Sequence, residues 1–304
     1  MNGILVINKD IGYTSRDVIN IISKCLDTKK VGHTGTLDPM ANGVLVVCVN
    51  QGLKMCELLT NHDKEYIAGV TLGIETDTLD MEGKILRKED IKLDKEKILK
   101  VVKSFKKTYL QEVPKYSAVK VNGRKLYEYA RKNLEVVLPK KEVTIYDIDV
   151  VDDIIMNDDN TISFNIKCIV SSGTYIRSLI RDIGHKLGTV AVMNSLTRTR
   201  LGNFSLQDAY SIDDIKNKRY KLTSIIDSFP LIQRIVVNDD MAFKIKNGCV
   251  MEKFFDNDLA FILDKNNKLL ALYKNIDNNS KVYRVFQQTL FCIYLYFSFI
   301  LCTY

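Results

Sequence analysis

The sequence lacks the cysteine and histidine patterns that hold a metal ion or build a disulfide framework. Its seven cysteines are scattered and never form a C-x-x-C pair, and its three histidines show no metal-ligand spacing. We therefore expect neither a bound metal nor structural disulfides. The cysteines are expected to be small hydrophobic residues in a reducing cytoplasm.

Other common motifs are missing too. The glycine-rich stretch at 32–43 contains neither G-x-G-x-x-G nor a glycine-rich loop ending in Lys-Ser/Thr, which argues against a dinucleotide site or a P-loop. The first ten residues, MNGILVINKD, lack the basic region of a signal peptide, so we expect them to form a first strand.

The composition is that of a soluble globular protein with an excess of positive charge. Its 304 residues suffice for one large domain or for a main domain with a small appendage, and 46% of them are hydrophobic. The net charge of +7 favours polyanionic partners, of which nucleic acid is the commonest. Charge alone leaves nucleic-acid binding open.

The apolar pattern predicts strands interleaved with helices. The predicted strands lie at 3–7, 43–49, 64–72, 144–150 and 161–169, and the predicted helices lie at 15–25, 94–107 and 174–187. Most of these strands alternate apolar and polar residues. We therefore expect an α+β domain with a mixed, mainly antiparallel sheet flanked by helices, rather than a doubly wound parallel sheet.

The character of the chain changes after Pro230. Short strand-like runs around one helical piece predict a small β-rich module at 231–286, following a main domain at 1–230. The last segment, 287–304, contains the apolar run LFCIYLYFSFILC, which is shorter than the roughly 20 residues of a membrane span. A buried or strand-like tail, an aberrant extension and a membrane anchor all remain open for it.

The stretch GHTGTLDPMANG, at 32–43, surrounds one carboxylate with glycines and small polar residues. Asp38 before Pro39 is a frequent turn opener, which gives a purely structural explanation. The neighbouring glycines would also let a bulky ligand approach the carboxylate closely, and His33, Thr34 and Thr36 would supply hydrogen-bonding groups around it. No second acid lies in this stretch, so a glycosidase-type pair is not offered locally. Both a turn and a catalytic role remain open for Asp38.

A second segment, at 116–131, interleaves basic and aromatic residues. Its sequence, YSAVKVNGRKLYEYAR, could hold phosphates with its cations and stack unpaired bases on its tyrosines. An amphipathic helix with a solvated basic face is the alternative. The candidate RNA-binding residues are Tyr116, Lys120, Arg124, Lys125 and Tyr127.

A third segment, SSGTYIRSLIRDIG at 171–184, carries an arginine on a partly apolar helical face. If Arg177 is drawn inward, its charge needs a carboxylate partner, for which Asp38 is one candidate. A surface position for Arg177 is equally compatible with the spacing.

Taken together, these stretches resemble the TruB family of pseudouridine synthases. The resemblance runs in order from residue 1 to about 230, and it includes LVINKDIGYTS at 5–15 and KEY at 64–66. It implies the pseudouridine synthase fold, with an RNA-contacting insertion at about 110–140. The module after Pro230 resembles the PUA-like appendage of bacterial members only loosely, and the final apolar run matches no part of that appendage.

The resemblance also implies roles for individual residues. Asp38 would be the catalytic aspartate, and Arg177 would pair with it and orient it. Tyr66 would stack on the target base and assist removal of the C5 proton. Leu196 would pack against the flipped nucleotide, and His33 would help to hold the RNA loop open.

The implied activity is isomerisation of uridine to pseudouridine at position 55 in the T-loop of tRNA, without cofactor or metal. The implied partner is tRNA, and we expect a cytoplasmic monomer without a protein partner or a membrane attachment. Three alternatives remain: a catalytically silent RNA-binding or RNA-folding protein, the same reaction on another RNA, and a Mg²⁺-dependent phosphoryl-transfer or hydrolytic enzyme with Asp38 as nucleophile.

Overall fold

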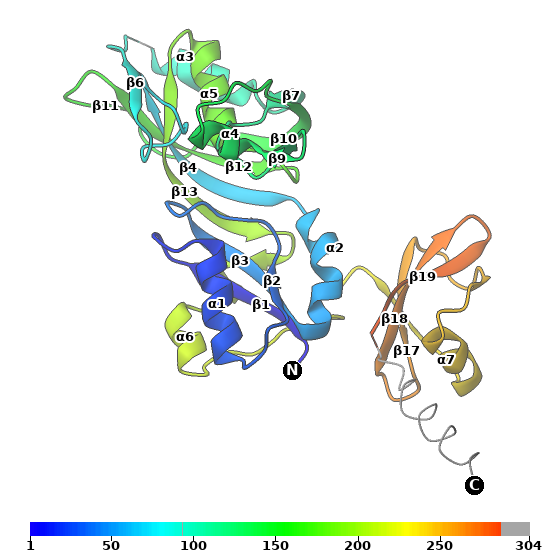
Figure 1. The fold of residues 1–304 in the computed structure, drawn as a ribbon. Coiled ribbons are helices and arrows are strands. Elements are labelled where there is room, and N and C mark those ends of the chain that lie inside the picture. The colour runs from blue at the N-terminus through cyan, green and yellow to red at the C-terminus, as the bar shows by residue number, and fades with distance from the viewer. Residues whose placement is uncertain (93, 287–304) are drawn as a thin grey trace. The chain divides into compact units, whose positions relative to one another are not determined.

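The computed structural model describes residues 1–92 and 94–286 (Figure 1). It separates into two compact units: residues 5–221 form the larger unit, and residues 1–4 group with the described residues from 222 onward. The expectations for the tail at 287–304 lie outside the described residues. The domain limits at 230 and 286 remain predictions.

The larger unit is organised around a ten-stranded sheet with the order β1-β3-β13-β4-β12-β10-β7, to which β2, β11 and β14 add at the sides. Its strands are β1 (Gly3–Lys9), β2 (Val31–His33), β3 (Asn42–Val49), β4 (Lys64–Leu72), β7 (Thr108–Glu112), β10 (Lys140–Val150), β11 (Ile155–Met156), β12 (Ile162–Val170), β13 (Ala191–Leu201) and β14 (Phe204–Ser205). Strands β3 and β13 pair in parallel, whereas β4 pairs antiparallel with both β12 and β13. The predicted mixed, mainly antiparallel sheet is confirmed.

Helices flank this sheet. They are α1 (Ser15–Cys25), α2 (Cys56–Thr60), α3 (Lys95–Lys103), α4 (Leu126–Arg131), α5 (Ile176–Leu187) and α6 (Ile212–Lys216), with 3₁₀ turns at Asn50–Met55 and Leu206–Asp208. Helices α3 and α5 contact each other and cover the same face of the sheet (Figure 1). Helix α5 carries Arg177.

Helix α5 is amphipathic and sharply bounded. Ile176, Leu179, Ile180 and Ile183 follow the spacing of one helical face and are buried against the sheet. The helix ends at Gly188, whose φ of 84° gives the left-handed cap that favours glycine. It begins at Ile176, two residues later than the sequence predicts, because Tyr175 is still extended, with φ −100° and ψ 113°.

Two small hairpins complete the larger unit. One pairs β5 (Ile74–Thr76) with β6 (Ile85–Lys88), and the other pairs β8 (Lys120–Val121) with β9 (Arg124–Lys125). The turn between β8 and β9 is Asn122-Gly123, with positive φ at both residues, as a two-residue hairpin requires. The basic segment 116–131 is therefore a hairpin followed by the short α4 rather than an amphipathic helix along its whole length.

The smaller unit is β-rich, as predicted. Its five-stranded sheet has the order β15-β17-β18-β19-β16 and carries one helix. The elements are β15 (Gln233–Val236), α7 (Asp239–Lys246), β16 (Met251–Glu252), β17 (Leu259–Leu263), β18 (Leu269–Ile276) and β19 (Asn279–Val285). Its core gathers Ile245, Ile262, Leu270 and Tyr273. Across residues 1–92 and 94–286, no helix is long and apolar enough to span a membrane.

Candidate active site

Asp38 lies on a turn that its neighbours fix from two sides. Its carbonyl accepts a hydrogen bond from the Ala41 N–H at 3.1 Å, which closes the turn. The buried Ser15 hydroxyl accepts from the Leu37 N–H at 2.9 Å and lies 3.2 Å from the Leu37 carbonyl. The carbonyl of Pro39 accepts from the Gly12 N–H at 2.8 Å. The turn role and the chemical role proposed for Asp38 are therefore compatible.

A buried lysine supports the same turn. The ammonium of Lys9, at the end of β1, donates to the carbonyls of Tyr13 at 2.7 Å, Asp10 at 3.0 Å and Pro39 at 3.5 Å. Burial lowers the pKa of Lys9, and the charges of Asp10 and Asp38 oppose this shift. The cation thus contributes to the positive potential beneath the Asp38 turn.

Arg177 forms the main ion pair with Asp38. Its Nη2 lies 3.1 Å from Asp38 Oδ2, and the arginine side chain is 9% exposed while that of Asp38 is 38% exposed. The same nitrogen donates to the Tyr116 carbonyl at 3.1 Å. Arg177 is therefore an enclosed cation that holds a carboxylate which solvent, and hence a substrate, can reach.

A second carboxylate, which the sequence analysis missed, completes the surroundings of Arg177. Arg177 Nη1 lies 3.3 Å from Asp80 Oδ2 and donates to the Thr78 carbonyl at 2.9 Å. The side chain of Asp80 is 7% exposed and also accepts from the Thr78 hydroxyl at 2.6 Å. The signal for it was the acidic stretch TDTLDMEG at 76–83, because an enclosed arginine needs its charge balanced.

Tyr175, also missed, lies within electrostatic reach of the pair. Burial raises the pKa of its phenol; the charge of Arg177 opposes that shift and the charge of Asp38 adds to it. The phenol therefore stays protonated at neutral pH. Its position two residues before Arg177 places it at the start of α5.

Tyr66 and Leu196 lie on neighbouring strands of the central sheet. Tyr66 on β4 pairs with Arg198 on β13, and Ala68 pairs with Leu196, so Tyr66 and Leu196 are diagonal neighbours on one face. Arg198 donates to the Gly35 carbonyl, in the loop that leads to Asp38, at 3.2 Å. The face that carries Tyr66 and Leu196 is therefore the face that this loop covers.

His33 is half-buried on β2, opposite Val47. Burial lowers its pKa, and the charges of Arg16 and Arg198 lower it further, so the imidazole is neutral at pH 7. Its Nδ1 is enclosed and makes no hydrogen bond within the described part of the chain.

The basic segment 116–131 contacts the ion pair through one residue. Tyr116, at its start, gives its carbonyl to Arg177 and points its hydroxyl at Asp77 Oδ2, 3.4 Å away. The rest of the segment makes cation–π contacts internally: Lys125 and Arg131 lie over the Tyr127 ring, and Arg124 lies over that of Tyr129. No contact joins Lys120, Arg124, Lys125 or Tyr127 to Asp38 among the described residues.

The described residues contain no group of three His, Cys, Asp or Glu side chains placed to hold a metal ion.

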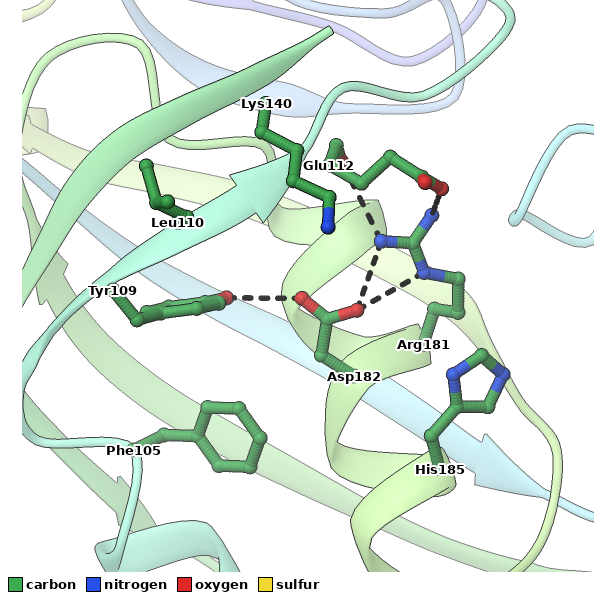
Figure 2. Close-up of a pocket in the computed structure, with 8 residues that line it drawn as sticks. All are labelled: Phe105, Tyr109, Leu110, Glu112, Lys140, Arg181, Asp182 and His185. Carbon is green, nitrogen blue, oxygen red and sulfur yellow. Dashed lines mark hydrogen bonds and ion pairs between the residues drawn. The ribbon is translucent and has the colours of Figure 1, made fainter. Parts of the chain in front are cut away.

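A surface hollow of about 420 Å³ lies on β7 and α5 (Figure 2). Its walls include Tyr109, Arg181 and Asp182 but none of the predicted site residues.

Comparisons with known proteins identify the family and the fold. Residues 23–176 match the model for the N-terminal domain of TruB family pseudouridylate synthases, and residues 177–242 match that for the C-terminal domain of tRNA pseudouridylate synthase B. The tRNA pseudouridine synthase B of Bacillus subtilis is 38% identical over 90% of this chain and 93% of its own length. That of Staphylococcus saprophyticus is 40% identical over 90% and 94%, respectively.

Solved structures show the same fold at lower identity. A chain of an H/ACA ribonucleoprotein bound to a substrate RNA superposes with a TM-score of 0.67 at 23% identity, covering 94% of this chain and 85% of that one. A chain of a Cbf5-Nop10-Gar1 complex gives 0.68 at 24% identity with the same coverage. Together with the curated relatives and the matched family models, this likeness leads to one conclusion: the chain belongs to the TruB family of pseudouridylate synthases.

Proposed function

We propose that this protein isomerises uridine to pseudouridine at position 55 in the T-loop of tRNA. Relatives of 38 to 40% identity that match 90% of this chain are named tRNA pseudouridine synthase B, which supports both the reaction and the class of substrate. The single observation that carries the proposal is the ion pair between the enclosed Arg177 and the exposed Asp38.

The reaction is balanced without any co-reactant. The N1–C1′ bond of uridine breaks, the uracil turns, and a C5–C1′ bond forms. The proton lost from C5 is matched by a proton gained at N1, so there is no net oxidation or hydrolysis. Acid–base groups and one ionised carboxylate suffice, and the residues around Asp38 supply them.

In this proposal Asp38 acts on the nucleotide and Arg177 orients it. The 3.1 Å contact leaves one carboxylate oxygen of Asp38 for the substrate. Charge-assisted hydrogen bonds of this kind fix geometry as well as charge. Asp80 holds the other side of the guanidinium and acts through Arg177.

Tyr66 and Leu196 are proposed to hold the extruded base between them. Removing a base from its stack costs a few kcal/mol, which stacking on an aromatic ring recovers. Their diagonal positions on β4 and β13 suit the two sides of one ring. The neutral His33 is proposed to occupy the RNA loop from which the base leaves.

The basic segment 116–131 is proposed to bind the RNA backbone. Tyr116, Lys120, Arg124, Lys125 and Tyr127 would form this surface within an insertion at about 110–140 of a catalytic domain at 1–230. The module at 231–286 would assist RNA binding. We place the protein in the cytoplasm as a monomer that needs no partner protein.

A tritium-release assay tests the function. A tRNA transcript labelled with tritium at C5 of uridine loses its label when C5 becomes bonded to the sugar. Native protein should release the label in the presence of EDTA, and Asp38→Asn should release none. Release by neither protein would leave a silent RNA-binding protein, and release only with Mg²⁺ would favour a different enzyme class.

A second experiment tests the substrate. Pseudouridine is mapped across total RNA from cells that lack the gene and from cells that carry it. Loss confined to the T-loop position is expected. Loss at other RNAs would support the alternative of a different RNA substrate.

A further inference from the structure

Gln111, on β7, is a polar side chain with 1% exposure beside the start of α5. Burying an amide costs free energy unless its hydrogen bonds are made. Both ends of this amide are bonded: Oε1 accepts from the Tyr175 N–H at 2.8 Å, and Nε2 donates to the Tyr109 hydroxyl at 2.9 Å. The side chain thus joins two segments 64 residues apart.

The bond to Tyr175 meets a need that helix α5 cannot meet alone. The first N–H groups of a helix have no acceptor within the helix. Tyr175 is the N-cap of α5, and no side-chain hydrogen bond caps it locally. Gln111 supplies an acceptor from another strand, at a residue only two positions before Arg177.

The orientation of the amide is fixed from its other end, at Tyr109, whose hydroxyl points at Asp182 (Figure 2). The Tyr109 hydroxyl donates to Asp182 Oδ2 at 3.2 Å, so its oxygen is free to accept from Gln111. Burial raises the pKa of Tyr109, and the Asp182 charge raises it further, which keeps that proton in place. Because the Tyr175 N–H can only donate, the atom facing it must be Oε1.

The neighbouring residue strengthens the same junction. The carbonyl of Glu112 accepts from the Ser178 hydroxyl at 2.8 Å, and its carboxylate lies 2.9 Å from Arg181 Nη1 (Figure 2). The end of β7 is therefore bonded to the first two turns of α5. Of these bonds, that of Gln111 is the one made to the backbone N–H at the N-cap of α5.

From this geometry we propose that Gln111 is a positioning residue for the Arg177–Asp38 ion pair. It fixes the backbone at the start of α5, and that backbone sets where the guanidinium meets the carboxylate. The proposal rests on the proposed function, because it assigns Gln111 a part in the rate of that reaction. Gln111 itself touches no substrate.

Three variants separate this role from a general contribution to stability. Gln111→Met keeps the length of the side chain and removes both hydrogen bonds. Gln111→Glu keeps an acceptor for the Tyr175 N–H. Asn157→Leu is the control, because Asn157 donates to the Thr161 and Ser163 hydroxyls in a turn far along the chain from α5.

The single-turnover rate of pseudouridine formation and the Kd for tRNA are measured for each variant. Gln111→Met is expected to lower the rate by about 10- to 100-fold, since small misplacements of catalytic groups have effects of this size. Its Kd should stay within about twofold of native, because the RNA-binding segment is intact. Gln111→Glu should recover part of the rate, because it keeps the acceptor for the Tyr175 N–H but loses the donor to Tyr109, and Asn157→Leu should retain the native rate.

A double-mutant cycle then asks whether Gln111 acts through Arg177. In an Arg177→Lys background, Gln111→Met should lower the rate by less than about twofold, because the geometry that it protects is already lost. An equal loss in both backgrounds, or a native rate for Gln111→Met, would overturn the proposal. If Gln111→Met does not fold, Gln111→Asn, which is one methylene shorter, carries the same expectation.

Hydrogen exchange distinguishes a failure of this inference from a failure of the proposed function. The amides at the start of α5 should exchange faster in Gln111→Met than in native protein, whatever the reaction. If native protein forms no pseudouridine but this exchange difference is present, the function is wrong and the junction is real. Unchanged exchange would reject the junction.

Discussion

Asp80 lies 3.3 Å from Nη1 of Arg177, which leaves Nη2 of the same guanidinium for Asp38. The enclosed cation therefore has one buried carboxylate and one exposed carboxylate. The buried partner fixes the arginine, and the arginine in turn fixes the carboxylate that solvent reaches. Positioning by a second group of this kind is how reactive residues keep their geometry.

Replacing Asp80 should therefore impair the reaction more than it impairs RNA binding. Asp80→Asn removes the buried charge but keeps the size of the side chain. We expect the single-turnover rate to fall by about 10- to 100-fold, with the Kd for tRNA within about twofold of native. Glu82→Gln, an exposed change in the same loop, is the matched control and should keep the native rate. A native rate for Asp80→Asn would contradict the proposed role.

Two glycines with positive φ should respond differently to alanine. A Cβ on Gly43, at φ 102°, would overlap the Arg198 backbone, whereas one on Gly123, at φ 79°, would meet nothing within 4 Å. Gly123→Ala should cost about 1 kcal/mol from backbone strain alone. Gly43→Ala should cost several times more, because β3 and β13 must also separate there. Denaturant unfolding measures the loss in free energy of unfolding for each variant, and equal losses would contradict this prediction.

The stability contributed at Lys64 should depend on pH. Burial lowers the pKa of this amine to about 8 from an ordinary value of 10.5, so between these values the unfolded chain binds more protons. Below pH 8 the native state carries the full free-energy cost of burying the charged ammonium. This cost disappears as the pH rises toward 10.5, so the free energy of unfolding should increase over that range.

Denaturant unfolding of native protein and of Lys64→Met at pH 7 and at pH 10 tests this sign. Native protein should gain about 1 to 3 kcal/mol relative to the variant over that range. A relative loss for the native protein at high pH would show that the hydrogen bonds of the ammonium to the Thr60 and His62 carbonyls outweigh the cost of its burial. Lys24→Met, on the exposed surface of α1, serves as the control.

Charges on the β8–β9 hairpin should control RNA affinity. Replacing Arg124 and Lys125 with alanine should weaken tRNA binding uniformly and reduce the salt dependence of log Kd by between about 1 and 2, as expected for two lost phosphate contacts. The rate within the bound complex should change little. Lys218 and Lys221, replaced together, provide a charge-matched control. An unchanged salt dependence would remove this hairpin from the RNA-binding surface.

Much of the fold could be predicted where apolar residues repeat with a clear strand or helix period. The strands at 64–72 and 161–169 and the helix around Arg177 alternate or repeat cleanly, and the structure confirms them within two residues. The run at 94–107 was predicted as a single helix, which is wrong at its end: α3 stops at Lys103 and β7 begins at Thr108. The chain continues as strand β7 because it pairs there with β10, a strand far along the chain.

The candidate site was predictable only in part, for a similar reason. The charge of an inward arginine suggested a carboxylate partner, which pointed to Asp38. Asp80 and Gln111 reach the same place through tertiary contacts: a bridge from Asp80 to Met193 on β13, and the bond from Gln111 to Tyr175. No local pattern encodes such contacts. By contrast, the Asn122-Gly123 pair is a strong hairpin signal within the sequence itself, and the structure places the β8–β9 turn there.

The carbonyl of Tyr116 has a consequence for attempts to change the substrate. This carbonyl accepts from Arg177 at 3.1 Å, although Tyr116 opens the basic segment 116–131. The segment therefore cannot be exchanged independently of the ion pair. Replacing it with that of another enzyme would also replace a carbonyl that accepts a hydrogen bond from Arg177. A graft that begins after Ser117 would leave that acceptor in place, so new RNA specificity is best sought from the hairpin onward.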